Sequence, residues 1–361
     1  MSGALAIART SFELPEELHA TEPPEARGLH RDEIRLLAVG SDQLRHVRFR
    51  DLGELLAPGD LLVVNTSATL AAAVDGIRPD GKPVIVHFSA PADDGTWVIE
   101  LRGGRGPLEG AAAGDLVYLP DGVRVEILQA HPDSRRERSR LWRAHIELFG
   151  PVEDFLERYG RAITYDYLRG TWPLSAYQTI FARERGSAEM PSAARPFTEH
   201  LVVDLITRGI AVAPILLHAG VSSLEVGELP QEERYEVPES TARMVNETRA
   251  SGGKVIAVGT TVTRALETVA GEDGSVRPGH GLTDLVLGPL HPARVVDGLI
   301  TGWHAPKASH LSLLEAVAGP EQVQRAYDEA IGARYLWHEF GDSCMFLPRQ
   351  SHHRMRRMRI L

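Results

Sequence analysis

The chain shows two kinds of hydrophobic pattern. Near the N-terminus, the apolar run "LLVV" at 61–64 predicts a buried strand, and "RFRDLGELLAPG" before it predicts a helix. From about 71 to 155, short segments such as "KPVIVHFSA" and "GTWVIELRG" alternate apolar and polar residues. Within them, "PDGVRVEIL" indicates a hairpin that turns at Asp121 and Gly122. These short strands predict a small antiparallel β-barrel inserted into a larger domain.

After about residue 156, strands and helices alternate, which is typical of a parallel or mixed sheet covered by helices. "IAVAPILLHAG" and "KVIAVGTT" indicate buried strands. "FTEHLVVDLITRG" indicates an amphipathic helix with Leu201, Leu205 and Ile206 on one side and Gly209 at its end. We therefore expect a mixed α/β fold in three parts. These are a discontinuous larger α/β domain (1–70 and 156–348), the inserted barrel (71–155) and a C-terminal tail (349–361).

Composition and charge limit the classes of function that the chain can have. The 361 residues carry a formal net charge of −10, so the chain lacks the overall basic character of many nucleic-acid-binding proteins. A local basic patch remains open at the tail "RQSHHRMRRMRIL", which contains five arginines and no acid. The tail suits either a solvated chain end or contact with phosphate groups.

A single cysteine, Cys344, excludes an internal disulfide and a cysteine-based zinc site, and it fits a reducing cytosol. The N-terminus has too short an apolar stretch for a signal peptide. No run approaches the roughly 20 apolar residues of a membrane span. We expect a soluble, cytoplasmic protein that is a monomer and has no membrane partner.

Polar and ionisable residues follow four of the predicted strands, where α/β proteins bind ligands. These residues are Asn65, Thr66 and Ser67; His218 and Gly220; Thr260, Thr261 and Arg264; and His304 and Lys307. Taken singly, each has a structural alternative: a hydrogen-bonded histidine, an exposed loop lysine, or an arginine paired with an acid. A packed sheet gains nothing from clustering such groups, so their recurrence favours a site.

The stretch "VIAVGTTVTRALETV" passes from strand to helix through Gly259, Thr260 and Thr261. One of the threonines could simply cap the helix. The corner also offers backbone N–H groups and hydroxyls to a carboxylate, phosphate or ribose.

Common catalytic signatures are missing from the sequence. Gly104-x-Gly106 is followed by Pro107, so it is not a dinucleotide-binding loop, and the chain has no P-loop, Gly-x-Ser-x-Gly or His-Glu-x-x-His. "WHEFGD" contains His338 and Asp342 without the second histidine of a zinc helix. We predict no metal.

Several longer segments together resemble one family, the S-adenosylmethionine:tRNA ribosyltransferase-isomerases of queuosine biosynthesis. These segments are "LLAPGDLLVVNTS", "YQTIFARERGSAEMPSAARPFTEHL", "ILLHAG", "ERYEVPESTARMVNE", "SGGKVIAVGTTVTRALETV", "VVDGLITGWHAPKASHLSLLEAVAG" and "AYDEAIGARYLWHEFGD". They occur in order from "FELPEEL" to about residue 347. The resemblance implies a larger α/β barrel-like domain with an inserted small β-barrel, in agreement with the pattern above.

The resemblance implies that S-adenosylmethionine is a co-substrate that gives its ribosyl group to a 7-aminomethyl-7-deazaguanine in tRNA. The ribose becomes an epoxycyclopentanediol, and adenine and methionine leave. Removal of a 5′ proton beside the sulfonium could start the rearrangement, and neutral His304 or His218 suits that task. Lys307 is the third catalytic candidate. The Gly259 corner would hold the methionine carboxylate or ribose hydroxyls, with Arg264 as counter-charge.

The family motifs also imply positions that bind S-adenosylmethionine or the acceptor. They are Asn65, Ser67, Tyr177, Gln178, Ser192, Phe197, Thr198, Gly220, Gly259, Thr260, Thr261, Arg264 and Asp342.

The sequence departs from the family pattern in loops. Asn65-Thr66-Ser67-Ala68 stands where the family usually has Asn-Asp-Thr-Arg, and Pro196 stands at a family histidine. Two alternatives therefore stay open: a divergent enzyme that uses S-adenosylmethionine with a small, deazapurine-like acceptor, and a catalytically silent protein that binds the cofactor or RNA.

Overall fold

The computed structural model describes residues 8–104, 106–132, 140–221 and 231–348. Contacts divide the chain into two compact units, which are described separately below. The first comprises Met1–Asn65, Ser192–Leu216 and Ser223–Leu361, and the second comprises Thr66–Pro191 and Leu217–Ser222. The second unit includes residues 156–191, which the sequence analysis assigned to the larger domain. The predicted domain boundaries therefore stay a prediction. The basic tail lies outside the described residues.

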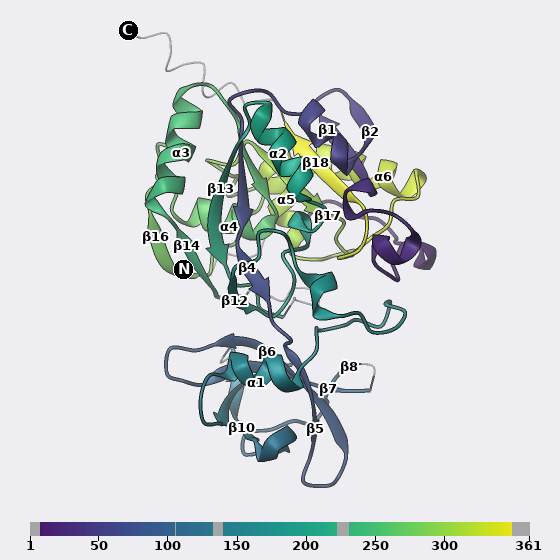
Figure 1. Ribbon diagram of the computed structural model, residues 1–361, viewed down its shortest axis with the longest axis vertical. Coiled ribbons are helices and arrows are strands. Elements are labelled where there is room, and N and C mark those ends of the chain that lie inside the picture. Colours follow the sequence, from purple (N-terminus) through teal and green to yellow (C-terminus); the bar gives the residue numbers. More distant parts are fainter. Residues whose placement is uncertain (1–7, 105, 133–139, 222–230, 349–361) are drawn as a thin grey trace. The chain divides into compact units, whose positions relative to one another are not determined.

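The first unit is built on a nine-stranded mixed sheet (Figure 1). In sheet order its strands are β16 (Gly279–Thr283), β14 (Glu233–Val237), β13 (Ala211–Leu217), β3 (Leu61–Asn65), β15 (Val255–Val258), β17 (Gly298–Gly302), β18 (Ser343–Leu347), β1 (Arg35–Gly40) and β2 (Leu44–Arg48). β3 is an inner strand, with β13 and β15 paired in parallel on either side and helices α3 and α4 in contact with it, and it is buried along its whole length. Burial on both faces explains why its sequence is a continuous apolar run.

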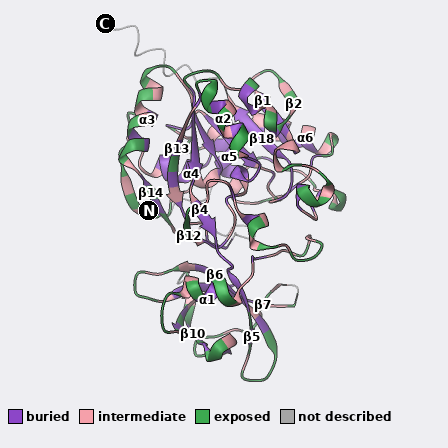
Figure 2. Cartoon of the chain, viewed as in Figure 1, coloured by how far each residue is buried: buried purple, intermediate pink, exposed green. Residues whose placement is uncertain are grey.

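Five α-helices lie among the described residues of the first unit. They are α2 (Glu199–Thr207), α3 (Glu239–Ala250), α4 (Thr260–Thr268), α5 (His310–Ala318) and α6 (Pro320–Gly332). Short 3-10 helices are η1 (Glu16–Leu18), η2 (Pro24–Arg27), η3 (Arg31–Glu33), η4 (Phe49–Glu54) and η7 (Ser192–Ala194). α3 divides into a buried and an exposed face (Figure 2), with Thr241, Ala242 and Val245 buried. No helix among the described residues is long and apolar enough to cross a membrane.

Helix α2 follows its predicted pattern except at one position. Leu201 and Leu205 are buried, and Gly209 ends the helix with φ 82°. Ile206, which was expected on the same side, is 56% exposed. Leu201 and Leu205 are four residues apart and therefore lie on the same face of the helix. Ile206 is the next residue, and successive residues of a helix are rotated by about 100°, so Ile206 lies outside that face. The prediction for Ile206 was wrong.

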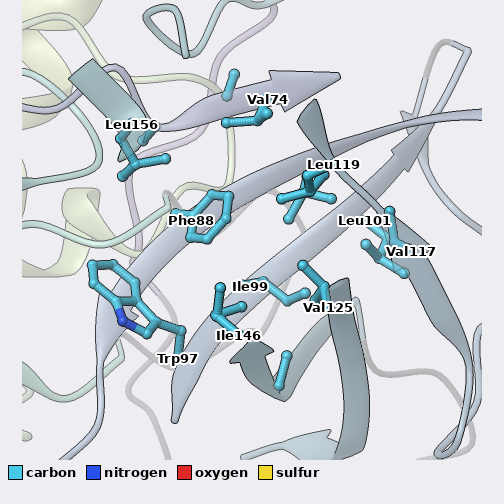
Figure 3. Close-up of a cluster of buried hydrophobic side chains, with 14 of the residues drawn as sticks. Val74, Phe88, Trp97, Ile99, Leu101, Val117, Leu119, Val125, Ile146 and Leu156 are labelled. Atoms are coloured by element: carbon cyan, nitrogen blue, oxygen red, sulfur yellow. The ribbon is translucent and has the colours of Figure 1, made fainter. Parts of the chain in front are cut away.

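The second unit contains a closed antiparallel barrel. Its strands are β5 (Ala73–Ile77), β6 (Pro83–Pro91), β7 (Trp97–Gly103), β9 (Leu116–Tyr118), β10 (Arg124–His131) and β11 (Leu141–Glu147), with the short β8 (Gly106–Pro107) beside β7. Pairing of β11 with β7 closes the ring. Figure 3 shows the core, in which Phe88, Ile99 and Val125 come from three different strands. The mixed α/β fold with a small antiparallel barrel is therefore confirmed.

The predicted hairpin is also confirmed. β9 and β10 pair in antiparallel fashion from Tyr118 and Arg124, and the short helix η5 (Pro120–Gly122) connects them. Asp121 and Gly122 both have positive φ, 59° and 74°. Two consecutive residues with positive φ are typical of the tight turns whose twist matches that of paired strands.

Three further elements complete the second unit. Helix α1 (Val152–Tyr159) packs on β5, and η6 (Leu174–Tyr177) follows it in the chain. β4 (Ser67–Thr69) and β12 (Glu184–Ser187) form a two-stranded parallel sheet. The register of this pair shifts between Arg185 and Ser187, so Gly186 forms a bulge.

Candidate active site

The carboxyl ends of three parallel strands meet at one edge of the larger sheet. β3, β15 and β17 are parallel neighbours, so the residues that follow them share this edge. Asn65, the last residue of β3, donates from its side-chain amide to Thr261 Oγ1 at 3.4 Å. The topology therefore places Asn65 beside the corner that follows β15, at the same sheet edge as the residues that follow β17.

The Gly-Thr-Thr corner starts α4 without a side-chain cap. Gly259 is the N-cap residue, with φ 103°, and as a glycine it has no side chain with which to cap the helix. The alternative in which Thr260 or Thr261 caps α4 does not hold in this structure, and both are half-buried. The first turn of a helix has N–H groups without intrahelical partners, and Thr260 and Thr261 add two hydroxyls there, a set of groups that suits an anion or a polyol.

Arg264 departs from its expected role as a counter-charge at this corner. Its guanidinium forms an ion pair with Glu233 and donates to the carbonyl oxygens of Thr283 (3.0 Å), Gln231 (3.1 Å) and Leu285 (3.2 Å). The side chain is 8% exposed. Its charge is neutralised by Glu233, so Arg264 holds α4 to the neighbouring strands, as its structural alternative predicted.

His304 follows β17 and is held in place on several sides. Its Nε2 lies 3.0 Å from Thr301 Oγ1, its backbone N–H donates to Tyr327 Oη at 3.2 Å, and its carbonyl accepts from Trp337 Nε1 at 3.0 Å. The ring stacks on His310, with 4.5 Å between centroids and 4° between planes. These contacts fix the imidazole in one orientation.

The surroundings of His304 keep it neutral. Burial lowers the pKa of His304 well below its ordinary value of 6.5, and the nearby His310 and His338 lower it further. A neutral imidazole can accept a proton at physiological pH, as the prediction of a catalytic base requires. His310 was missed by the sequence analysis because a histidine at the start of a helix carries no signal by itself.

Lys307 lies in the exposed loop between β17 and α5 and has φ 65°. A residue with a β-carbon adopts this left-handed conformation at a cost, and such residues occur often at functional sites. The exposure of Lys307 fits either a substrate contact or its structural alternative, a loop lysine.

A small open pocket lies in the first unit, next to the end of β17. Its empty volume, including the solvent at its mouth, is about 280 Å³. Two predicted binding residues, Ser192 and Asp342, line it together with His338, whose φ is 74°. Asp342 accepts from the guanidinium of Arg35 at 2.7 and 3.0 Å and from the backbone N–H groups of Arg35 and Leu336, so it holds the pocket wall together.

Two half-buried histidines, His310 and His338, make stability depend on pH. Burial lowers the pKa of His310 to about 4 and that of His338 to about 3. The unfolded chain binds protons below about pH 6.5 while these folded groups do not, so unfolding free energy falls as pH drops. For His310 alone we expect a loss of about 2 kcal/mol between about pH 7 and about pH 5. Urea titrations of the wild type and of His310→Gln test this, because the variant should lose less stability; equal losses would contradict it.

Other predicted binding residues have structural partners. Phe197 is fully buried and packs edge-to-face on Phe49, 5.1 Å away. Thr198 caps α2 by accepting from Leu201 N–H and donates to Asp32. Their roles in binding stay predictions, although the structure accounts for both residues by packing and capping.

In the second unit, Tyr177 and Gln178 hold β4. The Gln178 amide bonds to both backbone groups of Thr69, at 2.8 and 3.0 Å, and the Tyr177 carbonyl accepts from Thr69 Oγ1 at 2.7 Å. These bonds are typical of a structural clamp. Gly220 is buried in the segment that follows β13.

Also in the second unit, His218 is fixed by two serines and a glycine. Ser67 Oγ lies 2.7 Å from His218 Nδ1 and 2.6 Å from Ser187 Oγ. A β-carbon added to Gly186 would lie 2.4 to 2.6 Å from three atoms of the imidazole, so the ring lies against the glycine backbone. Ser67 and His218 were predicted from the sequence, whereas Ser187 and Gly186 were missed.

No group of three or more His, Cys, Asp or Glu residues arranged to hold a metal occurs in residues 8–104, 106–132, 140–221 and 231–348. The histidine pair His338 Nε2 and His19 Nδ1 is 2.8 Å apart, which is a hydrogen-bond distance.

Comparison with known proteins gives one consistent result. The model of the family described as queuosine biosynthesis protein matches residues 7–346. The S-adenosylmethionine:tRNA ribosyltransferase-isomerase of Symbiobacterium thermophilum is 37% identical, over 93% of this chain and 98% of that protein. The protein of the same name from Pelotomaculum thermopropionicum is 36% identical, over 92% and 97%.

A solved structure agrees with the sequence relatives. The S-adenosylmethionine tRNA ribosyltransferase of Thermotoga maritima is 28% identical and superposes with a TM-score of 0.51, covering 94% of this chain and 99% of that one. Both the sequence match and the structural match extend over nearly the whole chain. The chain belongs to the family of queuosine biosynthesis proteins.

Proposed function

We propose that this protein is an enzyme, an S-adenosylmethionine:tRNA ribosyltransferase-isomerase. It transfers the ribosyl group of S-adenosylmethionine to the aminomethyl nitrogen of 7-aminomethyl-7-deazaguanine in tRNA, and the product is epoxyqueuosine, with adenine and methionine released. The observation that carries the proposal is the match to enzymes of this name over nearly the full length of both chains. We place the reaction in the cytoplasm and assign it to a monomer.

S-adenosylmethionine is the ribosyl donor, and its sulfonium acidifies the hydrogens on the adjacent 5′ carbon. The corner at Gly259, Thr260 and Thr261 fits the methionine carboxylate or the ribose hydroxyls, because α4 begins there without a side-chain cap. Asn65 supports this role, since its amide holds the Thr261 hydroxyl. We do not assign Arg264 to the carboxylate, because Glu233 already neutralises it.

His304 and His218 are the two candidates for the base that takes the 5′ proton. The lowered pKa of His304 and its fixed ring support it as a neutral proton acceptor. Lys307, exposed on the loop before α5, would contact the acidic part of a substrate.

The test is product analysis by mass spectrometry after incubation with S-adenosylmethionine, with and without tRNA that carries 7-aminomethyl-7-deazaguanine. Release of adenine and methionine that requires this tRNA, with a matching gain in nucleoside mass, supports the proposal. Release without tRNA would favour a small-molecule acceptor. Binding of S-adenosylmethionine without release would favour a silent binding protein.

We expect the affinity for tRNA to fall steeply with added salt. Each phosphate contact releases counterions, and a protein that makes six to ten contacts loses about three to five orders of magnitude of affinity between about 50 and 200 mM salt. Filter binding over this range measures the slope. A flat dependence would contradict tRNA as the acceptor.

A further inference from the structure

His304 and His310 form a stacked pair of imidazoles in the first unit. Their ring centroids are 4.5 Å apart and their planes differ by 4°. The lone pairs and N–H groups of an imidazole lie in the plane of the ring, so two parallel stacked rings do not hydrogen-bond to each other through their nitrogens. His310 therefore meets His304 through its aromatic face, a contact to which the proposed reaction assigns no role.

The fold places His310 independently of His304. His310 is the first residue of α5, and Leu311 and Leu314 in that helix are fully buried. α5 contacts β17, the strand that ends at Gly302, two residues before His304. A side chain on a packed helix is placed more precisely than one on a loop, so the tertiary structure maintains the stack.

At neutral pH neither ring of the pair is charged. Burial lowers the pKa of His310 to about 4, and the nearby charge of Arg264 on α4 acts in the same direction. Burial is also the largest cause of the lowered pKa of His304. The further lowering by His310 is a repulsion between two charged rings, so it applies only where His310 is protonated, below about pH 4.

Two other titratable groups face His304, and both are neutral near pH 7. Tyr327 on α6 accepts a hydrogen bond from the backbone N–H of His304, and burial raises the pKa of its phenol well above 10. Burial lowers the pKa of His338 to about 3. A proton that arrives on His304 at neutral pH therefore meets the face of an uncharged ring.

A positive charge is attracted to the face of an aromatic ring. We propose that His310 is a positioning residue whose ring face stabilises the imidazolium that forms when His304 takes the 5′ proton of S-adenosylmethionine. In that step the C5′–H bond breaks, its electron pair stays on the carbon beside the sulfonium, and the proton forms an N–H bond on His304. His310 neither gives nor takes a proton. Because the charge on His304 develops only during the reaction, the stack stabilises the transition state more than the bound substrate.

This inference rests on the proposed function for the source of the proton, and two substitutions of His310 test it. His310→Phe keeps an aromatic face and has no ring nitrogen to protonate, whereas His310→Leu replaces the ring with an aliphatic side chain. We expect His310→Leu to lower kcat for adenine release about tenfold at unchanged KM for S-adenosylmethionine, and His310→Phe to recover most of that loss. A loss in His310→Phe as large as that in His310→Leu, or no loss in either variant, would overturn the role of the ring face.

Ser309→Ala is the matched control at the start of α5. Ser309 is the N-cap residue, and its side chain makes no capping hydrogen bond, so alanine there alters the start of the helix and keeps both rings of the stack. It should leave kcat unchanged. A loss in Ser309→Ala equal to that in His310→Leu would show that the effect comes from the start of the helix and would contradict the proposal.

Protonation of His304 can also be followed without turnover, by nitrogen-15 NMR of histidine-labelled protein over a pH titration. The spectrum of His304→Gln identifies the His304 signals. We expect His304 to take up its proton at higher pH in His310→Phe than in His310→Leu, because only phenylalanine offers a face to the imidazolium.

Two NMR results would overturn the inference: uptake of the proton in His310→Phe at the same or a lower pH than in His310→Leu, or a His304 that stays neutral in both variants until the protein unfolds. An absence of adenine release by the wild type would instead overturn the proposed function, and the NMR comparison would still decide whether the face of His310 stabilises protonated His304.

Discussion

Replacing His304 with glutamine is expected to lower kcat for adenine release by about two to four orders of magnitude, the usual contribution of a general base. Glutamine keeps a hydrogen-bonding group near Thr301 Oγ1, but it cannot accept a proton at physiological pH. The affinity for S-adenosylmethionine should change little, because the corner at Gly259 belongs to a different strand end. Single-turnover assays and calorimetric titration measure the two effects separately.

His200→Gln is the control for this substitution, since His200 lies exposed on α2. The pH profile gives an independent check. Because burial lowers the pKa of His304 well below 6.5, the wild-type rate should persist as pH falls through 6.5 and decline only at lower pH. A variant with near-normal kcat, or a rate that halves near pH 6.5, would exclude His304 as the base.

Replacing Gly186 with alanine should displace His218. The new β-carbon would lie 2.4 Å from Cε1 of the imidazole, far inside contact distance, so the ring has to move away from Ser67. We expect a loss of roughly 100-fold in kcat, because small misplacements of a functional group are costly. Overpacking should also lower the free energy of unfolding by about 1 to 3 kcal/mol.

Gly106→Ala is the matched control in the same unit, since a β-carbon at Gly106 has no heavy atom within 4 Å. It should leave both kcat and the denaturation midpoint unchanged. A Gly186→Ala enzyme of normal kcat and normal stability would show that the position of His218 does not matter for the reaction.

Local patterns predicted the fold and the strand-end corners well. The apolar run of β3 and the change from strand to helix at Gly259 depend on neighbours in the sequence, and both occur as predicted. The Asp121-Gly122 turn is another local feature, because positive φ angles favour those residue types. Such features need no knowledge of distant segments.

Side-chain roles that depend on distant segments were harder to predict. Nothing near Arg264 in the sequence indicates that Glu233 pairs with it. Phe197 packs on Phe49, which lies far from it in the sequence. Ser187 gains its place beside His218 only through the pairing of β12 with β4. A single sequence shows which residues could react, whereas hydrogen-bond partners follow from the tertiary structure.

The bonds of Arg264 have a consequence for binding at the corner of α4. They join the first turns of this helix to Glu233 and Thr283, which pair with each other across β14 and β16. The donors at Thr260 and Thr261 are therefore ordered as the chain folds, before a ligand arrives. Conformational entropy already lost in folding is not lost again on association. The corner is preorganised, and the freedom that a ligand gives up there is chiefly its own.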